Sequence, residues 1–244
     1  MAGPDPLGDR RPHVWVNCAA SLDGRLALAG GKRAHLSGPE DLARVQRIRA
    51  QSDAILVGVG TVVKDDPSLR VHWELLGLPP GKNPTRVVVD ASGRTPVDAR
   101  VLDGSTPTIV ATSERSTRAF PPHVRTVVAG KTRVDLPKLF AMLFDLGVRR
   151  LMVEGGAEIL ASVLRSGLFD RFTVYYAPVV IGGASAPALV SGPESRNADE
   201  ALTLVLVGVE RVGAGYLATY VPPGARAAGV PVVSSPDSVR DSSS

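Results

Sequence analysis

Cysteine and histidine are scarce in this chain of 244 residues, which contains one cysteine, Cys18, and four histidines. A single cysteine excludes a disulfide within the chain, and His13, His35, His72 and His123 show no His-x-x-x-His or Cys-x-x-Cys spacing. We therefore expect no bound metal. Cys18 lies in an apolar run, where a buried, unreactive thiol is the expected state.

Long apolar segments and clusters of one charge are also missing. No apolar stretch approaches the ~20 residues that a membrane helix needs, and the polar segment 1–11 lacks the apolar core of a secretory signal. We expect a cytoplasmic protein with no membrane contact.

Aromatic residues make up 5% of the chain, and lysine and arginine are scattered, so nucleic-acid binding is not expected. A net charge of +4 suits an anionic small substrate or a phosphorylated cofactor.

Several catalytic signatures are absent as well. The chain has no Gly-x-Ser-x-Gly elbow of a hydrolase and no Gly-x-Gly-x-x-Gly fingerprint of an ordinary dinucleotide-binding domain. Gly130-Lys131-Thr132 resembles the end of a P-loop, but Arg125 stands where the earlier glycine is required. These absences remove the commonest hydrolase and nucleotide-triphosphatase mechanisms from consideration.

The apolar runs that are present predict an α/β fold in a single domain. We expect a flexible arm at 1–11, one domain at 12–221 and a disordered, serine-rich tail at 222–244. Short runs rich in Val, Ile and Leu predict buried strands at Val14–Ala20, Ala54–Gly58, Arg86–Asp90, Thr108–Thr112, Thr126–Ala129 and Arg150–Glu154. Helical patterns lie between them at Pro39–Gln51, Leu136–Leu146 and Ala157–Arg165. Such alternation predicts a mostly parallel central sheet with helices on both faces.

The last part of this domain follows a different pattern. Arg171–Ala177, Thr203–Val212 and Gly215–Tyr220 are strand-like, and no helix separates the final two. The turn at Val212–Gly215 predicts a hairpin, so the sheet should have an antiparallel C-terminal edge. The segment Trp73–Pro84 is rich in proline and predicts a loop.

The first candidate site is the helix that follows Ser37. Ser37 and Glu40 have the spacing of a capping box, which predicts that the helix starts there. Its expected apolar stripe comprises Leu42, Val45 and Ile48, with Arg44 and Arg47 on the solvated side.

Arg49 lies two turns after Leu42 and roughly 20° from it around the helix. An arginine beside an apolar stripe needs an anionic partner or a route to water. Two partners remain open, namely a carboxylate of the same chain, or a phosphate or ribose of a ligand.

Two glycine turns follow buried strands. In Gly58–Pro67, glycines at the end of a strand let the backbone approach a ligand, and Thr61 and Asp65 share a helical face. The alternative is an ordinary strand-to-helix turn. In Leu151–Glu158, an apolar strand ends in Glu154 and is followed by two glycines and a helix. This arrangement is typical of turns that bind a phosphate. The alternative for Glu154 is a charge that simply reaches solvent.

Taken in order, five segments resemble the pyrimidine reductases of riboflavin biosynthesis, which form the C-terminal domain family of the riboflavin-specific deaminase/reductases. They are NCAASLDGRLA (17–27), the segment 37–73, NPTRVVVD (83–90), LMVEGG (151–156) and YYAPVVIGG (175–183). The resemblance implies a dihydrofolate-reductase-like fold. It also implies reduction of a ribosylamino-pyrimidinone 5′-phosphate to its ribitylamino product by hydride transfer from NADPH, with NADH as the alternative cofactor and a homodimer as the expected assembly.

The resemblance also implies roles for individual residues. The cofactor would contact Gly58, Thr61, Asp65, Asp90, Gly155, Gly156, Ala157 and Glu158. The substrate would contact Asn17, Arg49, Leu69, Arg70, His72 and Glu154, and Asn17 and Glu154 would take part in catalysis.

Asn17 and His72 depart from the bacterial pattern. Many bacterial members carry a lysine in place of Asn17, and both residues are more similar to those of the archaeal and fungal stand-alone branch. Only a short arm precedes the domain, so we expect deamination to occur elsewhere. The substrate is then either the 2,5-diamino compound or its deaminated form. A reductase of another pterin or specialised metabolite, and a non-catalytic nucleotide sensor, are the competing hypotheses.

Overall fold

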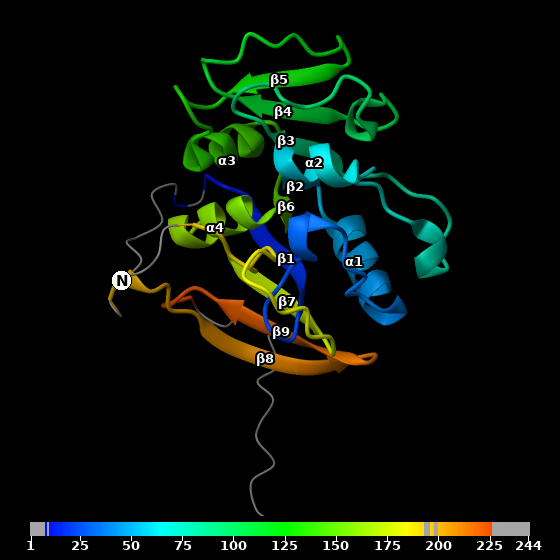
Figure 1. Ribbon diagram of the computed structural model, residues 1–244. Coiled ribbons are helices and arrows are strands. Elements are labelled where there is room, and N and C mark those ends of the chain that lie inside the picture. Colours follow the sequence, from blue (N-terminus) through cyan, green and yellow to red (C-terminus); the bar gives the residue numbers. More distant parts are fainter. Residues whose placement is uncertain (1–7, 9, 193–195, 198–199, 226–244) are drawn as a thin grey trace, which may run out of the picture.

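A nine-stranded sheet forms the centre of the computed structural model, which describes residues 8, 10–192, 196–197 and 200–225 (Figure 1). The strands are β1 (His13–Ser21), β2 (Ala54–Gly58), β3 (Thr85–Val89), β4 (Thr108–Thr112), β5 (Val124–Val128), β6 (Arg150–Gly155), β7 (Arg171–Ala177), β8 (Val205–Val212) and β9 (Gly215–Val221). The helices are α1 (Pro39–Gln51), α2 (Val59–Asp65), α3 (Leu136–Asp145) and α4 (Ala157–Ser166), with short 3₁₀ turns at Ala29–Gly31, Trp73–Leu76 and Arg100–Leu102.

The strand order is β5-β4-β3-β2-β6-β1-β7-β9-β8. All pairs from β5 to β7 are parallel, whereas β9 pairs antiparallel with β7 and with β8. The β8–β9 hairpin closes at Val212 and Gly215. The predicted parallel sheet with an antiparallel C-terminal edge is therefore confirmed.

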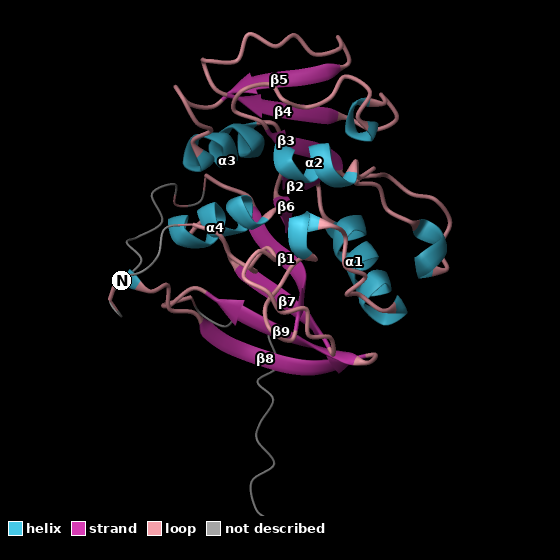
Figure 2. Cartoon of the chain, viewed as in Figure 1, coloured by secondary structure: helices cyan, strands magenta, loops and turns pink. Residues whose placement is uncertain are grey.

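Helices cover both faces of the sheet, as Figure 2 shows. One apolar cluster packs α3 and α4 against alternate side chains of the strands, such as Val16 of β1 and Leu56 of β2. A second cluster packs α1 and α2 against the opposite face, where Ile55 and Val57 of β2 contribute. Side chains that alternate along a strand point to opposite faces, so these uninterrupted apolar runs supply both cores.

Most of the predicted arm and tail lies outside the described residues, which omit 1–7, 9 and 226–244. Two residues at the end of the predicted arm are held by ion pairs. Arg10 contacts Asp145 at 2.7 Å, and Arg11 contacts Asp170 at 2.6 Å.

The predicted bounds of α1, Pro39–Gln51, are confirmed, but the predicted capping box and the predicted orientation of the helix are wrong. The N-cap is Gly38 without a side-chain cap, and the Ser37 hydroxyl instead donates to the Asp41 carboxylate at 2.5 Å. Leu42 is 41% exposed, whereas Asp41 is buried, and Arg44, placed on the solvated side, keeps only 15% of its side chain exposed.

The buried residues of α1 are thus Asp41, Gln46 and Ile48, because this helix packs partly on polar groups of the sheet. The predicted loop 73–84 also begins with the 3₁₀ turn Trp73–Leu76.

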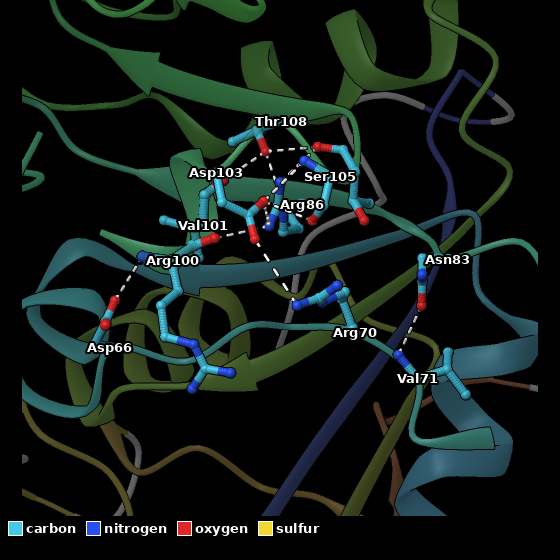
Figure 3. Close-up of polar contacts among 11 residues, drawn as sticks. Asp66, Arg70, Val71, Asn83, Arg86, Arg100, Val101, Asp103, Ser105 and Thr108 are labelled. Carbon is cyan, nitrogen blue, oxygen red and sulfur yellow. Dashed lines mark hydrogen bonds and ion pairs between the residues drawn. The ribbon is translucent and has the colours of Figure 1, made fainter. Parts of the chain in front are cut away.

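A fully buried arginine fixes the loop between β3 and β4, as the close-up in Figure 3 shows. Arg86 of β3 donates to Thr108 Oγ1 at 2.9 Å, to the carbonyl of Arg100 at 2.9 Å, to Asp103 Oδ1 at 2.9 Å and to the carbonyl of Thr106 at 2.6 Å. Burial lowers the pKa of Arg86, and the Asp103 carboxylate opposes that effect. The Arg86 guanidinium therefore ties this loop to the sheet at several points.

Replacing Arg86 with Met should lower the free energy of unfolding by about 3 kcal/mol, because two buried carbonyls and a carboxylate lose their donors. Urea denaturation measures this loss. The exposed Arg125 of β5 provides the control, since Arg125→Met should change stability by less than about 0.5 kcal/mol. Equal stabilities for the two variants would show that the network does not hold the loop.

Candidate active site

The two predicted glycine turns are neighbours in the structure. Strands β2 and β6 pair side by side, and their last aligned residues are Val57 and Gly155. A Cβ placed on Gly156 would lie 3.2 Å from the Thr61 Oγ1 of α2. The turns therefore open at the same end of the sheet, where ligands of α/β proteins bind.

The backbone of the second turn requires glycine. Gly155 has a φ of +121° and Gly156 a φ of +33°, conformations that residues with a Cβ rarely adopt. Gly156 is the N-cap of α4 and provides no side-chain cap, so the first N–H groups of that helix remain available to an anion. Ala157 and Glu158 form the first turn of α4, and Glu158 is exposed.

The first turn contributes two polar side chains. Thr61 is half-buried and Asp65, the last residue of α2, is exposed. Gly58 packs closely on α4, since a Cβ there would lie 2.7 Å from Ile159 Cγ1. The close approach of Gly58 brings the starts of α2 and α4 together over the strand ends.

The carboxylate of Asp90, a predicted cofactor residue, is engaged within its own turn. This carboxylate is fully buried. It accepts hydrogen bonds from the backbone N–H of Arg94 at 2.9 Å and from the N–H and hydroxyl of Thr95, each at 2.7 Å. Asp90 therefore shapes the turn after β3, a role that its position at a strand end did not reveal.

Arg49 and Glu154 meet in a two-pronged ion pair. Arg49 Nε donates to Glu154 Oε1 at 2.6 Å and Nη2 donates to Oε2 at 2.5 Å. Their side chains are only 14% and 12% exposed. Burial alone would lower the pKa of Arg49, but the adjacent Glu154 carboxylate outweighs it and raises that pKa. Of the two partners left open by the sequence, the structure shows the internal carboxylate.

A β-bulge orients Glu154. The pairing of β2 with β6 runs from Leu56 opposite Val153 to Val57 opposite Gly155, which leaves Glu154 without an opposite residue. Bulges redirect a side chain and recur beside active sites. The carboxylate is thereby directed toward α1, where Arg49 lies.

The segment after α2 approaches the same pair. Arg49 Nη1 donates to the carbonyl of Arg70 at 2.9 Å. Leu69 is buried and has a φ of +50°, a strained conformation for a residue with a branched side chain. The Arg70 side chain points toward Asp103, at 3.9 Å (Figure 3). The exposed ring of His72 contacts Glu74 at 2.9 Å.

Asn17 lies beside Glu154. The registered pairs of β1 and β6 end at Val16 and Val153, and Asn17 and Glu154 are the next residues on their strands. The buried Asn17 Oδ1 accepts from Arg44 Nη2 and from Thr173 Oγ1, each at 2.8 Å. The sequence interpretation missed Arg44, although its spacing of three residues from Asp41 suits an ion pair on one helical face.

The described residues contain neither a metal-binding cluster nor a membrane-spanning helix. Their His, Cys, Asp and Glu side chains form no group of three or more that could hold a metal ion. Their helices include none with the length and apolar character needed to cross a membrane.

Comparison with known proteins gives consistent matches over this whole body. Residues 12–218 match the family described as the RibD C-terminal domain. The chain is 41% identical over 218 residues to the 2,5-diamino-6-ribosylamino-4(3H)-pyrimidinone 5′-phosphate reductase of Methanothermobacter thermautotrophicus, covering 88% of this chain and 100% of the relative. It is 40% identical to the reductase of the same name from Archaeoglobus fulgidus, covering 86% of this chain and 97% of the relative.

A solved structure of Thermotoga maritima is similar as well. Its diaminohydroxyphosphoribosylaminopyrimidine deaminase/5-amino-6-(5-phosphoribosylamino)uracil reductase superposes with a TM-score of 0.76 at 27% identity. The match covers 88% of this chain but 58% of that chain. The chain thus corresponds to a part of the bifunctional protein and to the full length of the archaeal relative.

Proposed function

The chain belongs to the RibD C-terminal domain family, and from this premise we propose that it is the NADPH-dependent reductase of 2,5-diamino-6-ribosylamino-4(3H)-pyrimidinone 5′-phosphate in riboflavin biosynthesis. The observation that carries the proposal is the adjacency of Thr61 with Gly156 beside the Arg49–Glu154 pair. One end of the sheet therefore offers both a turn suited to a phosphate and a largely buried ion pair. The identity of 41% to the archaeal reductase over its full length supports the diamino substrate.

The residues of the chain fit a nicotinamide dinucleotide. Backbone N–H groups at Gly155, Gly156 and Ala157 would hold its diphosphate, because glycine leaves them open and the dipole of α4 favours an anion. Thr61 and Asp65 would contact the dinucleotide from α2, with the backbone of Gly58 close by. When bound, the cofactor supplies a hydride to the first carbon of the opened sugar.

The substrate would lie between α1 and the strand ends. Opening of the ribosyl ring gives an imine, and hydride addition at its carbon must be matched by a proton at its nitrogen. Glu154, which Arg49 keeps in place, would pass a proton from solvent to this nitrogen. Asn17, Leu69, Arg70 and His72 would surround the pyrimidine and the sugar phosphate, so that orientation supplies most of the rate.

Oxidation of NADPH by the purified protein, followed by absorbance, tests the proposal. We expect turnover with the 2,5-diamino compound, less with its deaminated form, and none without a pyrimidine. Turnover of a dihydropterin instead would support the competing reductase hypothesis, and rescue of a riboflavin auxotroph by the gene would exclude that hypothesis. Binding of NADPH without turnover of any of these compounds would support the nucleotide sensor.

NADPH is favoured over NADH by the charges around the β3 and β4 ends. Dinucleotide-binding folds that take NADH place a free acid at a strand end to bind the ribose 2′-hydroxyl, whereas Asp90 is buried and committed to its own turn. Arg94, Arg115 and Arg118 are exposed on the adjoining loops. A Cβ on Gly93 would lie 2.4 Å from the Arg118 Cβ, so these loops touch.

The double variant Arg94→Ala, Arg118→Ala should raise the KM for NADPH by about 30-fold, because each of the two lost contacts to a 2′-phosphate is worth about 1 kcal/mol at an exposed site. The KM for NADH should stay within about twofold. Steady-state kinetics with both cofactors measure the difference, and Arg125→Ala is the control. An equal rise for both cofactors would remove these arginines from the 2′-phosphate site.

We propose a homodimer that forms through the outer strands β8 and β9. Leu206, Val209 and Tyr216 are 53%, 47% and 37% exposed. Their pairing register places them on one face of the hairpin, where Tyr216 stacks on Tyr176 at 5.0 Å between ring centroids. An apolar edge of this kind requires cover in solution.

Val209→Glu should shift the protein from dimer to monomer, because a carboxylate would be buried at the centre of the contact. Size-exclusion chromatography with light scattering measures the mass. Val97, which is exposed on a loop, gives the control variant Val97→Glu, which should remain dimeric. A Val209→Glu variant with an unchanged mass would place the interface elsewhere.

A further inference from the structure

Asn17 is held in one orientation by donors on two sides. Its Oδ1 accepts from Arg44 Nη2 and from Thr173 Oγ1, each at 2.8 Å. A guanidinium can donate but cannot accept, so the oxygen of the amide must face Arg44. The Nδ2 group, which carries two hydrogens, lies on the other branch of the amide and has no hydrogen-bond partner within the described part of the chain.

The Thr173 hydroxyl lies on the second side of the Asn17 amide, and a neighbouring donor also restricts its hydrogen bonds. Trp15 Nε1 donates to Thr173 Oγ1 at 2.8 Å, and an indole N–H cannot accept. The Thr173 hydrogen can then point at Asn17 Oδ1 at 2.8 Å, and the carbonyl of Val16 at 3.3 Å is its other acceptor. The donor-only guanidinium of Arg44 therefore sets the orientation of the amide, and the shorter contact of Thr173 agrees with that orientation.

Arg44 is itself fixed from α1. Its Nε donates to Asp41 Oδ1 at 2.8 Å, and the buried Asp41 accepts on its other oxygen from Ser37 at 2.5 Å. This chain of contacts links the start of α1 to the strand residue Asn17.

Stability does not account for this arrangement. Arg44 Nη1 is buried and has no hydrogen-bond partner in the described residues, and a buried N–H without a partner costs free energy. A buried ion pair is often no more stabilising than an apolar residue of similar size. The arginine is therefore better explained by the orientation it imposes than by its contribution to folding.

We propose that Arg44 is a positioning residue, which acts by holding the Asn17 amide so that Nδ2 is presented as a donor to an acceptor atom of the substrate. The inference rests on the proposed function for the identity of that substrate. Asn17 and Glu154 follow the last registered pair of β1 and β6, so the oriented donor lies beside the charged pair. Arg44 would thus set the specificity for a substrate that presents an oxygen or ring nitrogen at this point.

A double-mutant cycle separates positioning from a structural role. Arg44→Met should lower kcat/KM for the pyrimidine by about 10- to 100-fold, the effect of one lost hydrogen bond in a buried site. Affinity for NADPH should be unchanged, and Arg44→Lys should lose less because an ammonium still donates. Since Arg44 acts through Asn17, the double variant Asn17→Ala, Arg44→Met should be no slower than Asn17→Ala alone.

Arg47→Met is the matched control, because Arg47 is exposed on the same helix, and its kcat/KM should equal that of the wild type. Thr173→Val removes the second donor and should lower kcat/KM in the same way if Arg44→Met does not fold. Additive losses in the cycle, or a fully active Arg44→Met variant, would overturn the proposal.

A second readout does not depend on turnover. In the ligand-free protein, NMR relaxation of the Asn17 side-chain amide should give an order parameter of about 0.8 in the wild type, typical of a rigid group. The value should fall clearly in Arg44→Met and stay high in Arg47→Met. A wild-type protein that fails to reduce the pyrimidine would contradict the proposed function, whereas an unchanged order parameter in Arg44→Met would contradict the positioning role.

Discussion

Glu154→Gln lowers kcat/KM for the pyrimidine substrate by about 100-fold or more, the usual range for loss of a general acid or base. The amide cannot hold the proton that the imine nitrogen requires. It also leaves Arg49, which is 14% exposed, without its anionic partner. NADPH affinity, measured by fluorescence titration, should change by less than about twofold, since the phosphate turn is intact.

Two comparisons sharpen this result. Glu210→Gln, at an exposed residue of β8, should retain wild-type kinetics. The double variant Glu154→Gln, Arg49→Ala should be at least as impaired as Glu154→Gln alone, and full activity in that double variant would remove both residues from the active site.

Gly156→Val weakens NADPH binding by about 100-fold or more. A φ of +33° is strained for a β-branched residue, and a Cβ at this position would lie 3.2 Å from Thr61 Oγ1. The added side chain would also cover the N–H groups at the start of α4, where the diphosphate is expected. Fluorescence titration with NADPH measures the loss, and circular dichroism confirms that the variant is folded.

Gly60→Ala is the control for this prediction. A Cβ at Gly60 would meet no atom within 4 Å, and alanine suits a helix better than glycine. Its NADPH affinity should match that of the wild type. Tight binding of NADPH by Gly156→Val would mean that the cofactor does not use this turn.

The strands were the most predictable part of the fold. Ala54–Gly58 and Thr108–Thr112 were predicted at their observed bounds, because apolar runs bounded by polar or turn-forming residues have few alternatives. The order of the strands was not predictable. The insertion of β6 between β2 and β1 is a long-range pairing that no local pattern specifies.

The orientation of α1 could not be derived from apolar periodicity alone. A helical wheel places Leu42 inward and Arg44 outward, whereas the structure does the reverse. The reason is that Asn17 and Thr173 present polar atoms on the face of the sheet that α1 covers. A helix that packs on such a surface buries charged residues that can pair with it, and only the strand alignment reveals this surface.

The candidate site was predicted in part. The sequence placed both glycine turns at strand ends, and the pairing of β2 with β6 brings them together. It left open whether Arg49 contacts a carboxylate or a ligand, because a bulge at Glu154 decides where that carboxylate points. The inward turn of Asp90 was equally hidden, since it depends on backbone groups of Arg94 and Thr95.

A crystal structure with NADPH and the pyrimidine bound tests the central claim most directly. We expect the diphosphate on the backbone of Gly155 to Ala157, and the nicotinamide facing the substrate beside Glu154 and Asn17. Density for the dinucleotide at another part of the sheet, with the strand ends of β2 and β6 empty, would contradict the proposed active site.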